Sequence, residues 1–153
     1  MSLETLIRGR RTIRKFNDKP VPQELVVQLL QKAEQLCDYD GEVRWRYLYA
    51  GTHAERERLA DYISARAMEN RMARITLGPV IQSFRQRLVK VPANLIAIAK
   101  TDSDPIKKDE AYGTLCRILQ NFQLLAWEQQ LGMTWITSQP IIQNSVFFHR
   151  IGL

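Results

Sequence analysis

Apolar side chains recur at helical spacing over the first part of the chain. The first apolar face consists of Leu3, Leu6 and Ile7. Gly9 follows this face and is placed to end the helix in a left-handed conformation. Pro22 stands at a first helical position, ahead of a second apolar stripe. That stripe consists of Leu25, Leu29 and Ala33. The pattern predicts two helices joined by a polar, basic connection.

A change to alternating spacing marks the next element. One side of the alternation carries Trp45, Tyr47 and Tyr49, and the other carries Arg46, Leu48 and Ala50. This alternation predicts a strand over residues 45–50. Thr52 and Glu55 then form a capping box, in which the hydroxyl and the carboxylate each satisfy a backbone N–H at the helix start. A long helix is predicted behind the box, buried through Leu59, Tyr62 and Ile63.

The second half of the chain predicts another strand and the longest helix. Residues 93–99 form a largely apolar run, as in a strand buried on both faces. The longest helix spans Asp109 to Gln130. Its residues at core spacing are Leu115, Ile118, Leu119, Phe122, Leu125 and Ala126. Gln120 and Asn121 sit beside this stripe, either as an ordinary polar flank or with a role in binding.

Two stretches complete the pattern. Residues 133–137 predict a third strand, and Pro140 opens a last helix that closes near Gly152. The basic segment from Met68 to Lys90 is left unassigned, with a mobile segment over the site as one alternative. Strands among longer helices predict an α+β protein with a central sheet covered by helices. We expect a single domain over residues 1–153, because 45% hydrophobic residues in 153 suffice for one core.

The chain shows no sign of a membrane segment or a leader. No run of about 18 apolar residues exists that would span a bilayer. The start, Met1 to Glu4, lacks the basic and then apolar stretch of a signal peptide. We therefore expect a cytoplasmic protein.

Charge and the rarer residues narrow the classes of function. The formal net charge of +6 raises the possibility of nucleic-acid binding. Most charges lie on mixed-sign helical faces, and no stretch interleaves aromatic and basic residues, which disfavours it. Cys37, Cys116, His53 and His149 are isolated, so neither a zinc site nor a disulfide framework has support. The unneutralised positive charge lies mainly at residues 8–15 and 66–90.

The first of these basic segments suits the binding of a phosphate group. It runs from Arg10 through Arg11, Thr12 and Arg14 to Phe16. The guanidinium fork matches two phosphate oxygens, and a neighbouring hydroxyl or backbone N–H completes the coordination of an anion. The plainer alternative is an exposed, solvated basic turn after a helix.

The residues that follow extend this segment into a recognisable pattern. Arg-Arg-Thr-x-Arg-x-Phe, then Pro20-Val21-Pro22 and a helix ending in small residues, run from Arg10 to Ala33. Further matches are residues 91–99, Gln120-Asn121 and residues 131–136. In this order the chain resembles the nitroreductase family of FMN-binding flavoproteins. The resemblance implies an α+β fold whose central sheet is mainly antiparallel.

The sequence departs from that family in two places. Members usually carry Pro-Ser/Thr-x-x-Asn-x-Gln-Pro-Trp near the flavin ring, where this chain has residues 37–45 and keeps only Trp45. Members also usually continue past the position of Leu153 with a final strand and a tail, so relative to them the sequence is short at its C-terminus, either because it is incomplete or because this is a pared-down member. The ring contacts of the missing side chains do not transfer.

The resemblance implies an oxidoreductase that passes two electrons from NAD(P)H through FMN to a nitroaromatic, quinone or related small-molecule acceptor. By motif position, Arg10, Arg11 and Thr12 would bind the phosphate and ribityl end, and Arg14 the polar edge of the ring. Thr137 and Ser138 would bring backbone near the flavin ring. No side chain is assigned an acid–base role, because the cofactor carries the chemistry.

The resemblance also implies a homodimer, with FMN at the interface between its subunits. Trp45 and Trp135 are interpreted as core residues rather than flavin-stacking groups. Two alternatives stay open beside the oxidoreductase. One is a degenerate member that keeps the fold, has lost flavin chemistry and acts as a binding protein; the other, weaker, is a basic nucleic-acid-binding module.

Overall fold

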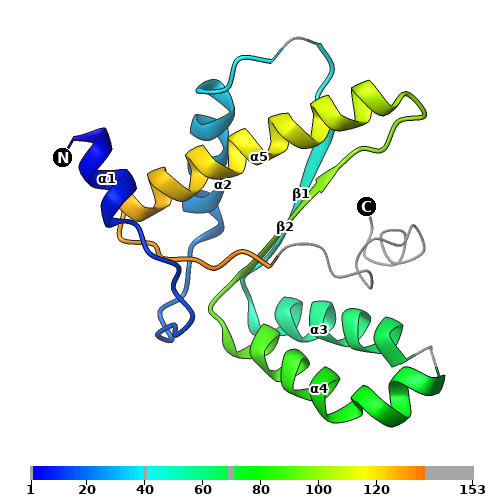
Figure 1. Cartoon of the computed structure of the whole chain (residues 1–153). Coiled ribbons are helices and arrows are strands. Elements are labelled where there is room, and N and C mark those ends of the chain that lie inside the picture. Colours follow the sequence, from blue (N-terminus) through cyan, green and yellow to red (C-terminus); the bar gives the residue numbers. More distant parts are fainter. Residues whose placement is uncertain (1, 40, 69–70, 137–153) are drawn as a thin grey trace. The chain divides into compact units, whose positions relative to one another are not determined.

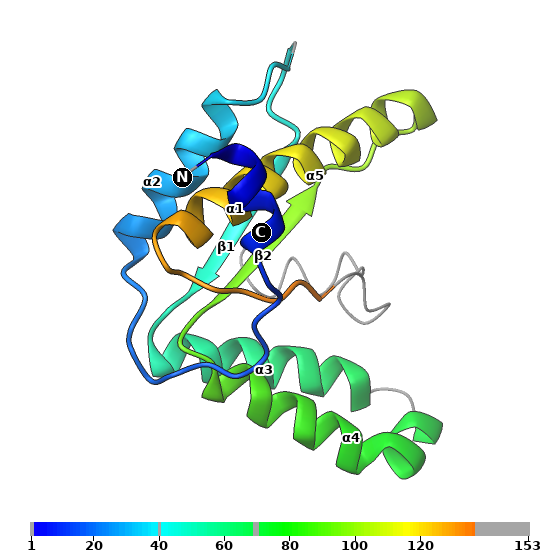
Figure 2. The same cartoon turned by 60° about the vertical axis from the view of Figure 1, so that its left-hand side comes forward.

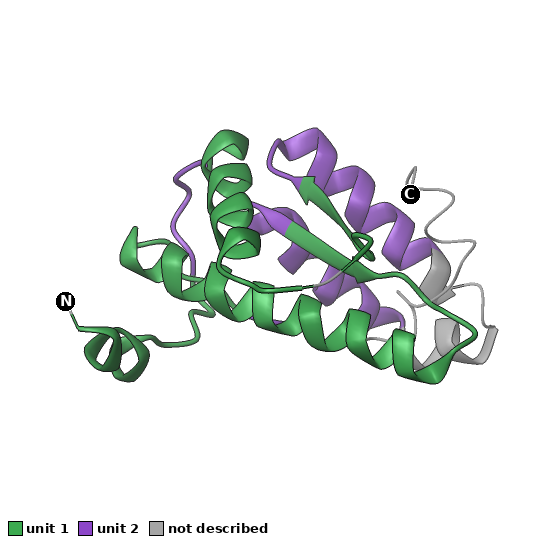
Figure 3. Ribbon diagram, turned by 90° about the horizontal axis from the view of Figure 1, so that it is seen from above, with its two compact units in different colours: residues 1–15, 21–49, 95–134 green, residues 16–20, 50–94, 135–153 purple. Residues whose placement is uncertain are grey.

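A computed structural model describes residues 2–39, 41–68 and 71–136 of the chain. In chain order the elements are α1 (Leu3–Gly9), α2 (Gln23–Gln35), β1 (Trp45–Ala50), α3 (His53–Met68), α4 (Arg71–Lys90), β2 (Asn94–Ala99) and α5 (Pro105–Glu128) (Figure 1). They fall into two compact units (Figure 3). Unit 1 comprises residues 1–15, 21–49 and 95–134, and unit 2 comprises residues 16–20, 50–94 and 135–153.

Unit 1 is built on the packing of α2 against α5. Its core cluster draws residues from α2, β1 and α5, with Ile118 fully buried at 0% exposure. β1 and β2 run in opposite directions (Figure 2), and the Lys100 N–H donates to the Arg44 carbonyl at 2.7 Å at one end of the pair. The α+β prediction, with antiparallel strands beside helices, is thereby confirmed.

Polar contacts join the aromatic face of β1 to α2. One carboxylate oxygen of Glu34 accepts from Trp45 Nε1 at 2.7 Å and from Tyr47 Oη at 3.0 Å. Burial, and then the charge of Glu34, raises the pKa of the Tyr47 phenol, which therefore stays a donor. The Tyr49 hydroxyl donates to the Val21 carbonyl ahead of α2. The alternation predicted over residues 45–50 is thus confirmed, because its aromatic face packs on the core.

Unit 2 contains α3 packed against α4. The segment that the sequence left unassigned folds mainly as α4, with Pro79 inside the helix. The predicted capping box is confirmed: Thr52 Oγ1 accepts from the Glu55 N–H at 3.2 Å, and the Glu55 carboxylate accepts from the Thr52 N–H at 2.9 Å. The same carboxylate also accepts from the Gly51 N–H at 3.0 Å. Leu59 and Ile63 are buried as predicted, and Tyr62 is half-buried.

The Glu55 cap predicts a pH dependence of stability. Hydrogen bonds from the backbone of Thr52, and then of Gly51, hold the pKa of Glu55 below its usual value. A carboxyl whose pKa is depressed by folding stabilises fully above its unfolded-state pKa of about 4.3 and loses that contribution as the pH falls through the folded value. We expect Glu55→Gln to lower the free energy of unfolding at pH 7, and this difference from the parent to shrink at acid pH.

Urea denaturation at pH 7, 5, 4 and 3 measures this difference. Glu24→Gln is the matched control, because Glu24 lies in the first turn of α2 and makes no side-chain hydrogen bond within the described residues. The control should lose little stability at any pH. A Glu55→Gln deficit that is the same at pH 3 and pH 7 contradicts the assignment.

The predicted ends of three helices are wrong by one or more residues. Gly9 is the last residue of α1, and Arg10 caps the helix with φ −59° and ψ 136°, so no left-handed residue ends it. Pro22 is the N-cap of α2, which begins at Gln23. α5 begins at Pro105, earlier than predicted, because Asp104 caps it by accepting from the Ile106 N–H at 2.9 Å.

Predictions for the strands and for Trp135 also need correction. β2 is half-buried along its length rather than buried on both faces, because the described sheet has only two strands. Residues 133–136 form no strand, and Thr137 lies outside the described residues. Trp45 is in the core as predicted, whereas Trp135 is 41% exposed. The helix predicted from Pro140 also lies outside the described residues.

Candidate functional site

The basic segment begins where α1 ends. Ser2 caps the start of α1, and the Arg10 N–H donates to the Leu6 carbonyl at its end. The Arg11 guanidinium turns back onto the helix, where Nη1 donates to the Arg8 carbonyl at 2.6 Å and to the Arg10 carbonyl at 3.0 Å. Carbonyls in the last turn of a helix lack an internal partner, so Arg11 satisfies groups that would otherwise need water. Among the described residues, its Nε and Nη2 have no partner, so they can serve a ligand.

Ile13 anchors the middle of the segment to the stretch that follows α5. Its backbone N–H donates to the Met133 carbonyl at 3.0 Å. Its side chain lies against Gly132, where a Cβ on Gly132 would stand only 2.4 Å from Ile13 Cγ1 and 3.1 Å from Ile13 Cβ. Carbon atoms in contact normally stand about 3.5–4.0 Å apart. Only glycine at position 132 therefore accommodates Ile13 in this place.

The polar side chains on either side of Ile13 are available to a ligand. Arg10 is half-buried, and Thr12 and Arg14 are exposed. Among the described residues, none of these three side chains makes a hydrogen bond or an ion pair. Two guanidinium groups and a hydroxyl with unused donors fit a bound phosphate or another anion, because the guanidinium fork matches two phosphate oxygens.

The structure describes four of the six predicted site residues, and their predicted role in binding stays a prediction. Arg10, Arg11, Thr12 and Arg14 follow one another along one anchored segment of unit 1. Thr137 and Ser138 lie outside the described residues, so their predicted place near the flavin ring stays a prediction.

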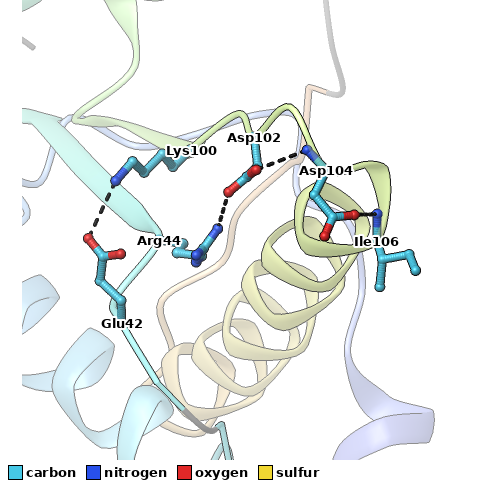
Figure 4. A network of polar contacts seen from close by, with 6 residues as sticks. All are labelled: Glu42, Arg44, Lys100, Asp102, Asp104 and Ile106. Carbon is cyan, nitrogen blue, oxygen red and sulfur yellow. Dashed lines mark hydrogen bonds and ion pairs between the residues drawn. The ribbon is translucent and has the colours of Figure 1, made fainter.

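The stretch that departs from the family pattern is held by ion pairs at the ends of the strands (Figure 4). Arg44 Nη1 lies 2.6 Å from Asp102 Oδ2, and Lys100 Nζ lies 3.4 Å from Glu42 Oε1. Asp102 Oδ1 also accepts from the Asp104 N–H at 3.0 Å. This backbone donor, and then Arg44, lowers the pKa of Asp102, so the pair is ionised at neutral pH.

The polar pair of α5 lines a shallow pocket. The pocket has a volume of about 470 Å³ and is lined by Leu36, Cys37, Cys116, Arg117, Gln120 and Asn121. Asn121 Nδ2 donates to Cys37 Sγ at 3.3 Å. Both cysteines are free thiols, with Cys37 buried and Cys116 half-buried. Gln120 and Asn121 thus face a pocket at the end of α2, which leaves their role in binding open.

Comparison with known proteins shows to which family the chain belongs. The sequence model of the Nitroreductase family matches residues 7–150. The chain belongs to the nitroreductase family. Because the match begins within α1 and takes in the whole basic segment, the predicted family is confirmed over almost the full length.

Individual relatives agree with this assignment. The Bacillus subtilis (strain 168) protein YfhC, which carries the name NAD(P)H nitroreductase, is 27% identical over 144 residues, covering 94% of this chain and 73% of that protein. A nitroreductase-like family protein from Bacillus cereus is 29% identical with a TM-score of 0.84, covering 100% of this chain and 78% of that one. An FMN-dependent nitroreductase from Clostridium difficile R20291, 20% identical with a TM-score of 0.58 over 95% of this chain and 69% of its own, shares the fold.

Two further observations concern metal sites and membrane-spanning helices. Across the described residues, no three His, Cys, Asp or Glu side chains gather as a metal site would require. None of the described helices combines the length and the apolar character needed to cross a bilayer.

The sequence did not reveal the contact that holds the basic segment. Ile13 and Gly132 lie far apart in the chain, and each reads as an ordinary apolar or small residue. Gly132 itself was the available signal. It stands between apolar residues soon after the longest helix, and a glycine in such a stretch often marks a place where another segment packs closely against the backbone.

Proposed function

We propose that the chain is an FMN-dependent oxidoreductase that passes two electrons from NAD(P)H to a nitroaromatic, quinone or related small-molecule acceptor. Membership of the nitroreductase family supports this proposal, as do the name of the Bacillus subtilis relative and the FMN dependence of the Clostridium difficile neighbour. The observation that carries it is the anchored basic segment, where Arg10 and Arg14 have no partner among the described residues.

Each residue of the segment has a distinct task in this proposal. Arg10 and Thr12 bind the phosphate and ribityl end, and Arg11 contributes the donors that its helix-capping contacts leave unused. Arg14 binds the polar edge of the ring, and Thr137 and Ser138 stay predicted as its backbone neighbours. When bound, FMN supplies the electron-transfer chemistry, while these residues bind and orient it.

Assembly and location are further parts of the proposal. We expect a homodimer, and the exposure of Leu3 and Ile7 on α1, at 67% and 51%, supports a surface that a second subunit covers. Light scattering coupled to gel filtration measures the mass in solution. We also expect the protein to act in the cytoplasm on a small-molecule acceptor.

An absorbance spectrum tests the proposed function. The purified protein is mixed with FMN, passed through a desalting column and scanned, and NADH or NADPH is then added without oxygen. A flavin band that elutes with the protein and bleaches with either nucleotide supports the oxidoreductase. A colourless protein whose melting temperature does not rise at excess FMN favours the degenerate binding protein instead.

One structural observation supports the alternative of a degenerate binding protein. Two residues of the stretch that replaces the family's ring-contacting segment are paired with residues that follow β2, since Arg44 pairs with Asp102 and Glu42 with Lys100. Side chains held in this way are less available to a flavin ring. The spectrum therefore separates a member that binds FMN mainly through its basic segment from one that no longer binds it.

A further inference from the structure

We propose that Ile13 and Gly132 together act as a positioning pair for the cofactor-binding residues Thr12 and Arg14. This inference rests on the proposed function, because the ligand that the positioned residues bind is taken to be FMN. The pair combines a backbone hydrogen bond from the Ile13 N–H to Met133, at 3.0 Å, with close packing of the Ile13 side chain on Gly132.

The anchor fixes the segment at the point where position matters most. Ile13 is half-buried and its neighbours Thr12 and Arg14 are exposed, so the side chain that packs lies directly between the two that are free to bind. Flexible arginine side chains lose rotamer freedom on binding, and a fixed backbone reduces what remains to be ordered. Without the anchor, the segment would follow only the short helix α1, which has no buried residue.

The tolerance of this contact for a larger residue is small. An added Cβ at position 132 would stand 2.4 Å from Ile13 Cγ1, so Ile13 must retreat by about 1 Å to reach ordinary contact. Charge-assisted hydrogen bonds have a narrow optimum of about 2.7–2.9 Å, and a displacement of this size weakens or breaks them. Gly132→Ala therefore moves Thr12 and Arg14 without removing any atom of the binding residues.

The experiment is a double-mutant cycle between Gly132→Ala and Arg14→Ala, read by the Kd for FMN from fluorescence quenching. We expect G132A alone to raise the Kd by about tenfold. In the R14A background, G132A should raise the Kd by less than about threefold, because the Arg14 contact with FMN that G132A would disturb is already absent. A G132A effect that is equal in both backgrounds, or absent from both, overturns the positioning role.

Two further variants keep the test decisive. Ile13→Ala combined with G132A removes Cγ1 and leaves only the Cβ contact at 3.1 Å, so the Kd should return toward the parent value. Gly113→Ala is the matched control, because a Cβ at that position in α5 meets nothing within 4 Å, and its FMN Kd should be unchanged. If G132A does not melt cooperatively, Ile13→Ala alone takes its place in the cycle with the same expectation of coupling to Arg14.

Failure of the proposed function is recognised separately. If the parent protein binds no FMN, isothermal titration with inorganic pyrophosphate tests the segment as an anion site. Binding that G132A weakens by about tenfold retains the positioning role and rejects the FMN proposal. Absence of pyrophosphate binding rejects both.

Discussion

Replacing Arg10 by alanine is expected to raise the Kd for FMN by roughly 10- to 100-fold while leaving the Kd for riboflavin almost unchanged. A charge-assisted hydrogen bond to a phosphate contributes about 1.5–3 kcal/mol, and each 1.4 kcal/mol corresponds to a factor of ten. Riboflavin lacks the phosphate that Arg10 is proposed to bind, so it should not respond. Fluorescence titration of both flavins against parent and variant measures the two constants.

Arg14→Ala gives the complementary pattern if the assignment along the segment is right. Arg14 is proposed to contact the ring, which FMN and riboflavin share, so both Kd values should rise by a similar factor. Lys15→Ala is the control for charge alone, because Lys15 is exposed, adjacent and of the same sign. Equal losses of FMN binding in all three variants would contradict specific contacts and indicate a diffuse electrostatic effect.

The structure separates residues that the sequence treats alike. Arg10 and Arg11 are adjacent residues of the same type. The Arg11 side chain donates to the Arg8 and Arg10 carbonyls, whereas the Arg10 side chain has no partner among the described residues. This difference depends on where the helix ends, and the sequence placed that end at a left-handed Gly9. A helix terminus is decided by small differences between capping arrangements, which composition alone does not resolve.

Local patterns predicted most of the secondary structure correctly. β1 was predicted to the residue, because the alternation of Trp45, Tyr47 and Tyr49 reflects a face that packs on the core. The capping box at Thr52 and Glu55 was likewise predicted, since its contacts lie within four residues of the chain. The early start of α5 was missed although Asp104 followed by Pro105 is a typical helix start.

The sequence predicted which side chains of the candidate site could bind an anion, but not the contact that holds their segment in place. The density of arginine and hydroxyl groups between Arg10 and Arg14 is visible in the sequence, and so is the family pattern. The contact between Ile13 and Gly132 is not, because it joins two ends of unit 1 that no local spacing relates. The burial of β2 was overestimated for a similar reason, since it depends on how many strands flank it.

Arg56→Ala is expected to lower the free energy of unfolding by about 2–3 kcal/mol, a loss of roughly 4–12 °C in melting temperature. Arg56 is half-buried on α3, and its guanidinium donates to the carbonyls of Val89 at 3.0 Å and Pro92 at 2.9 Å, and to that of Gly51. Val89 lies in the last turn of α4, where a helical carbonyl has no internal partner. Alanine removes the Arg56 donor from all three carbonyls.

The comparison with neighbouring variants shows whether geometry or charge is responsible. Arg58→Ala removes the same charge from an exposed position on the same helix and should change the free energy of unfolding by less than about 0.5 kcal/mol. Arg56→Lys keeps the charge but not the planar fork that reaches separate carbonyls, so its stability should fall between parent and alanine. Equal effects of Arg56→Ala and Arg58→Ala in urea denaturation would show that the contacts with the Gly51, Val89 and Pro92 carbonyls do not stabilise unit 2. If the loss in free energy of unfolding is instead largest for Arg56→Ala, smaller for Arg56→Lys and smallest for Arg58→Ala, the guanidinium of Arg56 stabilises unit 2 through its carbonyl contacts. Ile13 is proposed to hold the basic segment of unit 1 in a comparable way.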